Sequence, residues 1–156
     1  MSGLTAAGPL VTPLAAPLVA GDIVRGTCRL LAAHGHGTLT EVTLRTGRRV
    51  DVMALAPDGG ITVVEVKSSV QDFRSDRKWQ EYLDFCDRFF FAVGEGFPHD
   101  ILPGEPGLIV ADRFGAAIVR AAPESRLAPA RRKALTLKFA LLGSQRLTRT
   151  LDPEAC

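Results

Sequence analysis

The chain has 156 residues, of which 46% are hydrophobic and 23% are charged, and its formal net charge at pH 7 is +2. This composition is typical of a globular domain with one hydrophobic core, and it excludes a chain that is disordered throughout. The three cysteines are widely spaced and form no Cys-x-x-Cys pair, which argues against a disulfide framework or a zinc site and favours a reducing compartment.

The first 21 residues carry no charged side chain, and we expect them to form a flexible leader. No basic segment precedes their apolar residues, so a secretory signal is not expected. Pro9, Pro13 and Pro17 interrupt the stretch, which argues against a membrane-spanning helix. We therefore expect a soluble, cytoplasmic protein without a membrane partner, in which residues 22–150 form a single domain.

Hydrophobic periodicity predicts a mixed series of helices and strands after the leader. In chain order these are a helix at about 22–34, strands at 38–44, 48–55 and 61–67, a helix at 75–87, strands at 89–93, 107–111 and 116–119, and a helix at 128–148. Asp22 is a candidate N-cap of the first helix, which should end at Gly35. The order predicts an α/β fold with a mixed β-sheet flanked by helices.

Two of the predicted helices carry apolar stripes. Trp79, Leu83 and Cys86 form the first stripe, which we expect to face the core. Ala130, Ala134, Leu137 and Leu141 form the stripe of the last helix. Between the first helix and the first strand, His34-Gly35-His36-Gly37 is predicted to be a turn rather than a metal site.

Three charged residues interrupt the apolar runs that follow Arg48 and Arg49 in the predicted β-hairpin of strands 48–55 and 61–67. Asp51 lies on the first strand, and Glu65 and Lys67 share one face of the second. Buried charges are unfavourable unless they are paired or bound to metal. Two converging carboxylates are suitable ligands for Mg²⁺, which activates a bound water and neutralises phosphate charge, and Lys67 can orient that water. The alternative is a buried Glu65–Lys67 ion pair, with Asp51 as a turn or edge residue.

Asp51 followed by Glu65-Val66-Lys67 resembles the motif of the PD-(D/E)xK nuclease superfamily. Longer stretches are similar to the MmcB-like DNA repair family over about residues 22–148: Glu41, Gly47–Val52, Val64–Ser69, Asp72–Arg74, Lys78–Tyr82, Cys86-Asp87, Phe97-Pro98, Gly107–Asp112 and Arg131–Lys133. The resemblance implies a restriction-endonuclease-like fold with an αβββαβ core. It also implies a Mg²⁺-dependent DNA endonuclease acting in repair, with Mn²⁺ as a substitute metal. Asp51, Glu65 and Lys67 are then the catalytic residues, and Asp51 and Glu65 the metal ligands.

Three further residues are candidates for supporting this site. Lys78 and Tyr82 are similar to a Gln-x-x-x-Tyr pair found on the following helix in several PD-(D/E)xK families, with Lys in place of Gln. An exposed Lys beside a half-buried Tyr is the alternative. Glu41, on the neighbouring strand, would supply a third carboxylate if it is not simply a solvated strand residue.

Basic residues are concentrated near the end of the chain, where residues 125–156 contain seven Lys or Arg and two Asp or Glu. Arg131, Arg132 and Lys133, together with Arg48 and Arg49 beside the site, form a candidate surface for the DNA backbone. A solvated helix face is the alternative. A catalytically inactive nuclease-fold module that binds DNA or a repair partner is the second functional hypothesis, but the presence of Asp51, Glu65 and Lys67 favours the enzyme.

Overall fold

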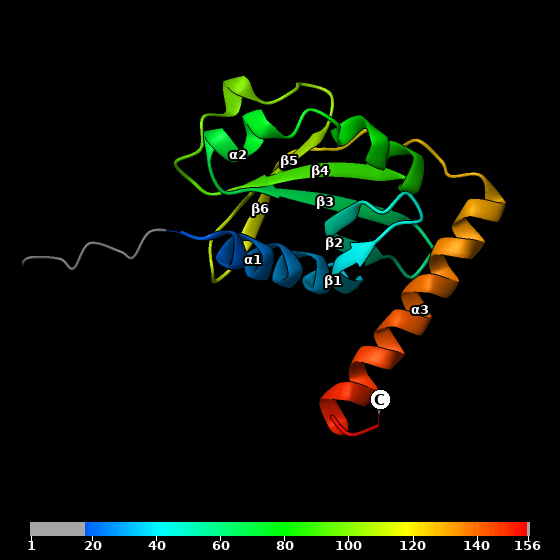
Figure 1. The fold of residues 1–156 in the computed structure, drawn as a ribbon. Helices are drawn as coiled ribbons and strands as arrows, with labels where there is room; N and C mark the ends of the chain where they lie inside the picture. Colours follow the sequence, from blue (N-terminus) through cyan, green and yellow to red (C-terminus); the bar gives the residue numbers. More distant parts are fainter. Residues whose placement is uncertain (1–17, 156) are drawn as a thin grey trace, which may run out of the picture.

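A six-stranded mixed β-sheet is the centre of the computed structural model, which describes residues 18–155 (Figure 1). The elements are α1 (Ala20–Ala33), β1 (Gly37–Thr43), β2 (Arg49–Leu55), β3 (Ile61–Lys67), α2 (Val70–Ser75), the 3₁₀ helix η1 (Trp79–Phe85), β4 (Arg88–Val93), the 3₁₀ helix η2 (His99–Ile101), β5 (Gly107–Ala111), β6 (Ala116–Arg120) and α3 (Pro129–Leu151). Most of the expected leader, residues 1–17, lies outside the described residues. No helix within residues 18–155 is long and apolar enough to span a membrane.

The strands lie side by side in chain order, from β1 to β6. Antiparallel pairs join β1 to β2, β2 to β3 and β5 to β6, whereas β3, β4 and β5 run parallel. Parallel neighbours need a crossover connection, and α2 with η1 provides it between β3 and β4. The predicted α/β class, with a mixed sheet flanked by helices, is therefore confirmed, and the element order is that of a restriction-endonuclease-like core.

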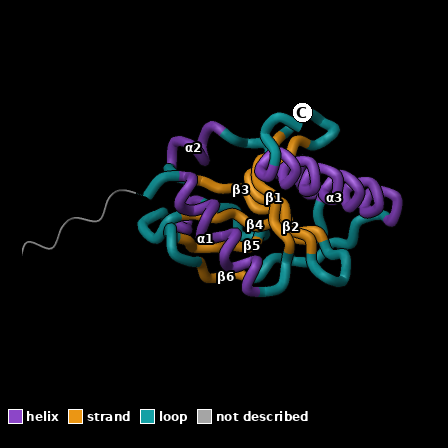
Figure 2. The backbone as a smooth tube through the Cα atoms, turned by 90° about the horizontal axis from the view of Figure 1, so that it is seen from below, coloured by secondary structure: helices purple, strands orange, loops and turns teal. Residues whose placement is uncertain are grey.

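The two faces of the sheet carry separate hydrophobic clusters. Ile23 and Leu31 of α1 pack on one face, against strand residues that include Val64 and Val66. The aromatic residues of η1 and one face of α3 pack on the other, against strand residues that include Val63. Figure 2 shows α1 crossing the sheet and α3 running beside β1. The strand alternation predicted for 61–67 is thus confirmed, since Val64 and Val66 lie on one face of the sheet and Val63 lies on the other.

The first helix begins at Ala20, two residues before the predicted start. Asp22 is its third residue rather than its N-cap, and its carboxylate accepts a hydrogen bond from the backbone N–H of Val19 at 3.3 Å. Gly35 has φ +80°, a left-handed conformation that ends the helix as predicted. Gly26 lies against the turn between β5 and β6, where a Cβ would come within 2.0 Å of the carbonyl oxygen of Asp112.

The single helix predicted for 75–87 is wrong, because two shorter elements replace it. Ser69 caps α2 by accepting a hydrogen bond from the backbone N–H of Asp72, and the chain becomes extended at Asp76. The following element, η1, is a 3₁₀ helix with three residues per turn. Its buried residues are therefore Trp79, Tyr82 and Phe85, while Leu83 of the predicted stripe is exposed.

The last helix is confirmed and extends to Leu151, but its predicted stripe faces solvent. Leu137 and Leu141 are 62% and 60% exposed. The side that packs on the sheet contains Leu135, Phe139 and Leu142, which also have helical spacing. The helix has apolar residues on two faces, and the sequence pattern alone does not distinguish them.

Candidate active site

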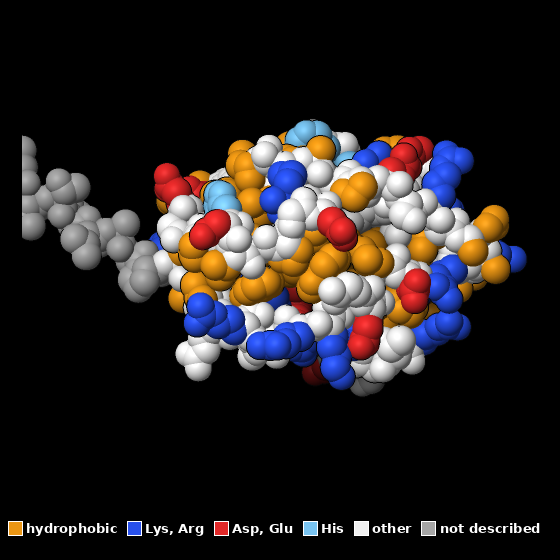
Figure 3. Space-filling model, turned by 90° about the horizontal axis from the view of Figure 1, so that it is seen from above, with side chains coloured by type: hydrophobic (Ala, Val, Ile, Leu, Met, Phe, Trp, Pro, Cys, Tyr) orange, Lys and Arg blue, Asp and Glu red, His pale blue; other side chains and the backbone are white. Residues whose placement is uncertain are grey.

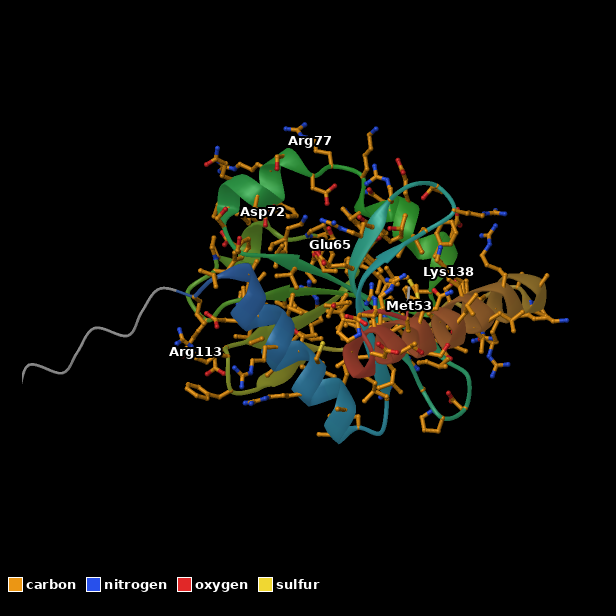
Figure 4. All side chains as sticks on the ribbon, turned by 60° about the horizontal axis from the view of Figure 1, so that its bottom comes forward. Met53, Glu65, Asp72, Arg77, Arg113 and Lys138 are labelled. Carbon is orange, nitrogen blue, oxygen red and sulfur yellow. The ribbon has the colours of Figure 1, made fainter. Side chains whose placement is uncertain are left out.

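The strands β2 and β3 separate at Asp51. Their antiparallel ladder ends at the pair Val52–Val64, and one further step would place Asp51 opposite Glu65. Instead, the Asp51 carboxylate accepts a hydrogen bond from the backbone N–H of Val66 at 2.7 Å. Residues at opposite positions of antiparallel strands project to the same face, so both carboxylates lie at this fork. Figure 4 shows Glu65 near the middle of the sheet, with Asp72 of α2 above it.

Lys67 lies beside Glu65 at the end of β3, and its ammonium group lies between two carboxylates. Its Nζ is 3.4 Å from Glu65 Oε1 and donates a 2.8 Å hydrogen bond to Asp76 Oδ2. The Lys67 side chain is only 4% exposed. Burial lowers its pKa, but the bond to Asp76 and the charge of Glu65 outweigh burial and leave the pKa raised. Lys67 is therefore a cation that donates hydrogen bonds at neutral pH.

Negative charge at the fork is only partly compensated. Burial, followed by the charge of Asp51, raises the pKa of Glu65 to about 8 despite the opposing effect of Lys67. Burial also raises the pKa of Asp51. The second oxygen of Glu65, Oε2, is buried and has no hydrogen-bond partner among the described residues. The site thus has acceptor capacity that the surrounding protein groups do not satisfy, and the ionised forms of both carboxyl groups are unfavourable there without a further cation.

These features fit a divalent cation that needs few protein ligands. Within residues 18–155, no group of three or more His, Cys, Asp or Glu side chains is arranged to hold a metal. Mg²⁺ is commonly bound through one or two carboxylates, keeping several waters and binding substrate phosphates. The unsatisfied Oε2 of Glu65 and the raised pKa values of Glu65 and Asp51 are what such a cation would compensate.

Glu41 is not brought into the fork. Its backbone has φ +50°, and the β1–β2 ladder passes from Thr40–Val52 to Val42–Val50 without a Glu41–Asp51 pair. The exposed Glu41 carboxylate lies 3.7 Å from Arg49 Nη2. Arg146 of α3 donates hydrogen bonds to the carbonyl oxygens of Thr40 and Glu41, which stabilises the irregular backbone.

Tyr82 and Lys78 contact the surroundings of the fork in different ways. Tyr82 is buried and its hydroxyl donates a 3.3 Å hydrogen bond to the carbonyl oxygen of Arg49, two residues before Asp51. The Arg48 guanidinium lies 5.7 Å from the centre of the Tyr82 ring and pairs with Glu81. The Lys78 side chain is exposed, but its backbone N–H donates to Asp76 Oδ1 at 3.2 Å. Lys78 therefore contacts Asp76 through its backbone and not through its side chain.

Asp76 is the residue that sequence reasoning missed. It follows α2, and it orients Lys67 through the shortest contact that the ammonium makes. A signal was present, because Ser69-Val70-Gln71-Asp72 is a helix-start pattern. A short helix that starts at Ser69 brings the following residues back to the end of β3. The polar residues after this helix, such as Asp76, are then candidates for the site.

The three predicted DNA-binding residues of α3 have different environments. Arg132 makes a two-point ion pair with the buried Asp87, at 2.6 and 2.7 Å, and also donates to the carbonyl oxygen of Gly59. Arg131 donates to the carbonyl oxygen of Asp84, and Lys133 is exposed. Burial would raise the pKa of Asp87, but hydrogen bonds from Arg132 and from two backbone N–H groups lower it to about 2. Arg132 thus connects α3 to the body of the protein.

Comparison with known proteins places this chain in a family. The model of the family described as "DNA repair protein MmcB-like" matches residues 16–154. A solved structure of a protein of unknown function from Silicibacter pomeroyi is 50% identical, with a TM-score of 0.85, over 93% of this chain and 97% of that chain. No curated protein matches. Because the family model covers most of the sequence, the chain belongs to the MmcB-like family of DNA repair proteins.

Proposed function

We propose that the protein is a metal-dependent DNA endonuclease that acts in repair, with Asp51, Glu65 and Lys67 as its catalytic residues. The observation that carries this proposal is the pair of carboxyl groups at the β2–β3 fork, whose ionised forms the protein groups around them stabilise poorly. Purely structural carboxylates are usually paired or hydrogen-bonded, as Asp87 is here. Buried groups with raised pKa values are typical of functional sites.

Each residue has a distinct role in the proposed reaction. Asp51 and Glu65 hold Mg²⁺, or Mn²⁺ in its place; when bound, the metal lowers the pKa of a water molecule and neutralises charge on the scissile phosphate. The Val66 N–H fixes the orientation of Asp51. Lys67 keeps its proton, donates a hydrogen bond to the attacking water and stabilises the negative phosphate, because its raised pKa makes it a poor general base.

The alternative is a catalytically inactive module that binds DNA or a repair partner. The observation in its favour is that Lys67 already has two carboxylate partners, Glu65 and Asp76. That pairing would suffice for a static ion-pair network. It leaves Glu65 Oε2 and the raised pKa of Asp51 without explanation, so we favour the enzyme.

A cleavage assay with matched variants tests the proposal. Labelled single-stranded, duplex, flap and junction DNAs would be incubated with the purified protein in Mg²⁺ or Mn²⁺. Asp51→Asn should lose cleavage while staying folded, since the amide oxygen can still accept the hydrogen bond from Val66. Asp58→Asn, in the exposed turn between β2 and β3, is the control and should cut at the wild-type rate. A folded wild-type protein that cuts none of these substrates, or an Asp51→Asn protein that cuts them normally, would refute the proposal.

A further inference from the structure

A cavity of about 440 Å³ lies between the β1–β2 turn, η1 and the first turns of α3. It shares no residue with the carboxylate fork. Its apolar wall is formed by Phe85, Ala128, Ala130, Ala134 and Leu135. Its charged residues are Arg45, Arg131 and Lys138, and no acidic residue lines it. Figure 4 shows Lys138 on α3, some way from Glu65, and Figure 3 shows basic side chains around apolar ones at the end of the molecule where α3 begins.

The three cations converge without an opposite charge. None of them forms an ion pair within the part of the chain that the structure describes. The guanidinium groups of Arg45 and Arg131 lie 5.9 and 5.3 Å from the centre of the Phe85 ring, which holds both in place. Like charges brought together repel one another, and an anion that enters the cavity relieves this repulsion. Preorganised arginines are well suited to binding phosphate.

The cavity and the carboxylate fork lie along the same 3₁₀ helix. Arg48 stacks on Tyr82, and Arg45 stacks on Phe85 three residues further along η1. The β1–β2 turn therefore runs alongside η1, with Tyr82 near the fork and Phe85 in the cavity wall. The Tyr82 hydroxyl bonds the carbonyl oxygen of Arg49, two residues before Asp51, and its pKa is raised first by burial and then by the charge of Glu65. A ligand that extends beyond the cavity along this turn approaches the fork.

We propose that this cavity binds one unpaired nucleotide of a DNA strand. The phosphate contacts Arg45, Arg131 and Lys138, and the base packs between the guanidinium planes and the apolar wall. Aromatic and arginine stacking together with basic side chains is a common way to bind single strands, and the volume is within the range of small-ligand pockets, roughly 300–1,000 Å³. A base in a duplex would first have to leave its stack, at a cost of a few kcal/mol. The identification of the ligand as DNA rests on the proposed function, and the inference adds a preference for DNA with unpaired nucleotides.

Binding measurements without cleavage test this inference. Fluorescence anisotropy with a labelled oligothymidine in EDTA would compare Arg45→Gln/Lys138→Gln with Arg126→Gln/Arg149→Gln, which removes the same charge from exposed positions outside the cavity. Arg131 and Phe85 stay unchanged because both also hold the local structure. We expect the cavity variant to bind at least about tenfold more weakly than the control variant. Its log–log salt slope should flatten by about 1.4, at roughly 0.7 for each lost contact on a single strand.

Four results would overturn the inference in whole or in part. Equal losses in the two variants, with both folded by circular dichroism, would show a diffuse electrostatic surface. A duplex of equal length that binds as tightly as the single strand, or inorganic phosphate that competes as well as dTMP, would remove the role of the base. The wild-type protein failing to bind the oligothymidine would remove the site altogether. The binding assay contains EDTA and is therefore independent of cleavage. A protein that binds through the cavity but cuts no DNA would refute only the proposed nuclease activity. A protein that cuts DNA but does not bind through the cavity would refute only the proposed nucleotide site.

Discussion

Replacing Glu65 by Gln should stabilise the metal-free protein and abolish cleavage at the same time. The physical reason is the buried carboxylate, whose pKa is raised from 4.5 to about 8, first by burial and then by the charge of Asp51. A group whose pKa is raised in the folded state binds its proton more tightly there than in the unfolded chain. Titration of Glu65 therefore leaves the free energy of unfolding unchanged below about pH 4.5. It lowers this free energy as the pH rises from there, and the loss is complete above about pH 8.

The size of this effect on stability follows from the difference between the ordinary pKa of Glu, 4.5, and the pKa of Glu65 in the folded protein, about 8. At pH 7 the unfavourable contribution is about 3 kcal/mol, since each pH unit above 4.5 contributes about 1.4 kcal/mol. Gln has no proton to lose, but it gives up the contact between Glu65 and Lys67. We therefore expect the Gln variant to gain about 1–3 kcal/mol at pH 7, or roughly 2–4 °C in melting temperature for each kcal/mol, and almost nothing at pH 5.

Urea unfolding in EDTA at pH 5, 6, 7 and 8, followed by circular dichroism, measures this difference. Glu95→Gln, an exposed carboxylate in the turn after β4, is the matched control and should change stability little at any of these pH values. The reasoning is refuted if the Glu65→Gln protein is less stable than wild type at pH 7 and 8. It is also refuted if the stability difference does not grow as the pH rises.

Three further predictions concern the neighbouring groups. Asp76→Ala should lower kcat by on the order of tenfold or more with little change in metal affinity, because it removes the acceptor that orients Lys67 without altering a metal ligand. Asp84→Ala is the exposed control, and an unchanged kcat in Asp76→Ala would exclude a positioning role. The Asp87–Arg132 ion pair is lost only when the pH falls to the lowered pKa of Asp87, so wild type should lose about 1–2 kcal/mol of stability between about pH 4 and pH 2. Asp87→Asn should be less stable than wild type at pH 7 and should lack this loss in acid. Millimolar Mg²⁺ should raise the melting temperature of wild type by binding the folded state, and an equal rise for Asp51→Asn would remove Asp51 from the metal site.

The local parts of the site were predictable from the sequence. Strand alternation places Glu65 and Lys67 on one face and Val64 and Val66 on the other, and the structure confirms it. The short turn between the strands also sets the register up to the pair Val52–Val64, so that Asp51 and Glu65 both follow the last pair of the ladder at the fork. These relations extend over one hairpin at most, and within a hairpin the alternation of side chains and the residues of the turn determine which residues lie together.

Relations between distant segments were not predictable in this way. Arg132 resembles its neighbours Arg131 and Lys133 in sequence, yet it alone pairs with Asp87, 45 residues earlier. Likewise, nothing local indicates that Arg45 lies beside Arg131 across one cavity. A count of basic residues predicts a charged surface. Which of those residues are free for a ligand depends on the partners that the fold brings to each.

The 3₁₀ form of η1 shows how a departure from the predicted helix affects the site. With three residues per turn, Trp79, Tyr82 and Phe85 share one face, and Trp79 and Tyr82 stack on Phe89 of β4. In an α-helix, each step of three residues shifts the side chain by about 60° around the axis, so Trp79 and Phe85 would be about 120° apart and the three rings would not share one face. Burial of these aromatic rings thus selects the tighter helix, and the tighter helix aligns the two rings on which Arg48 and Arg45 stack. The position of the arginines relative to the carboxylate fork therefore depends on aromatic packing in the core, and not only on the charged residues themselves.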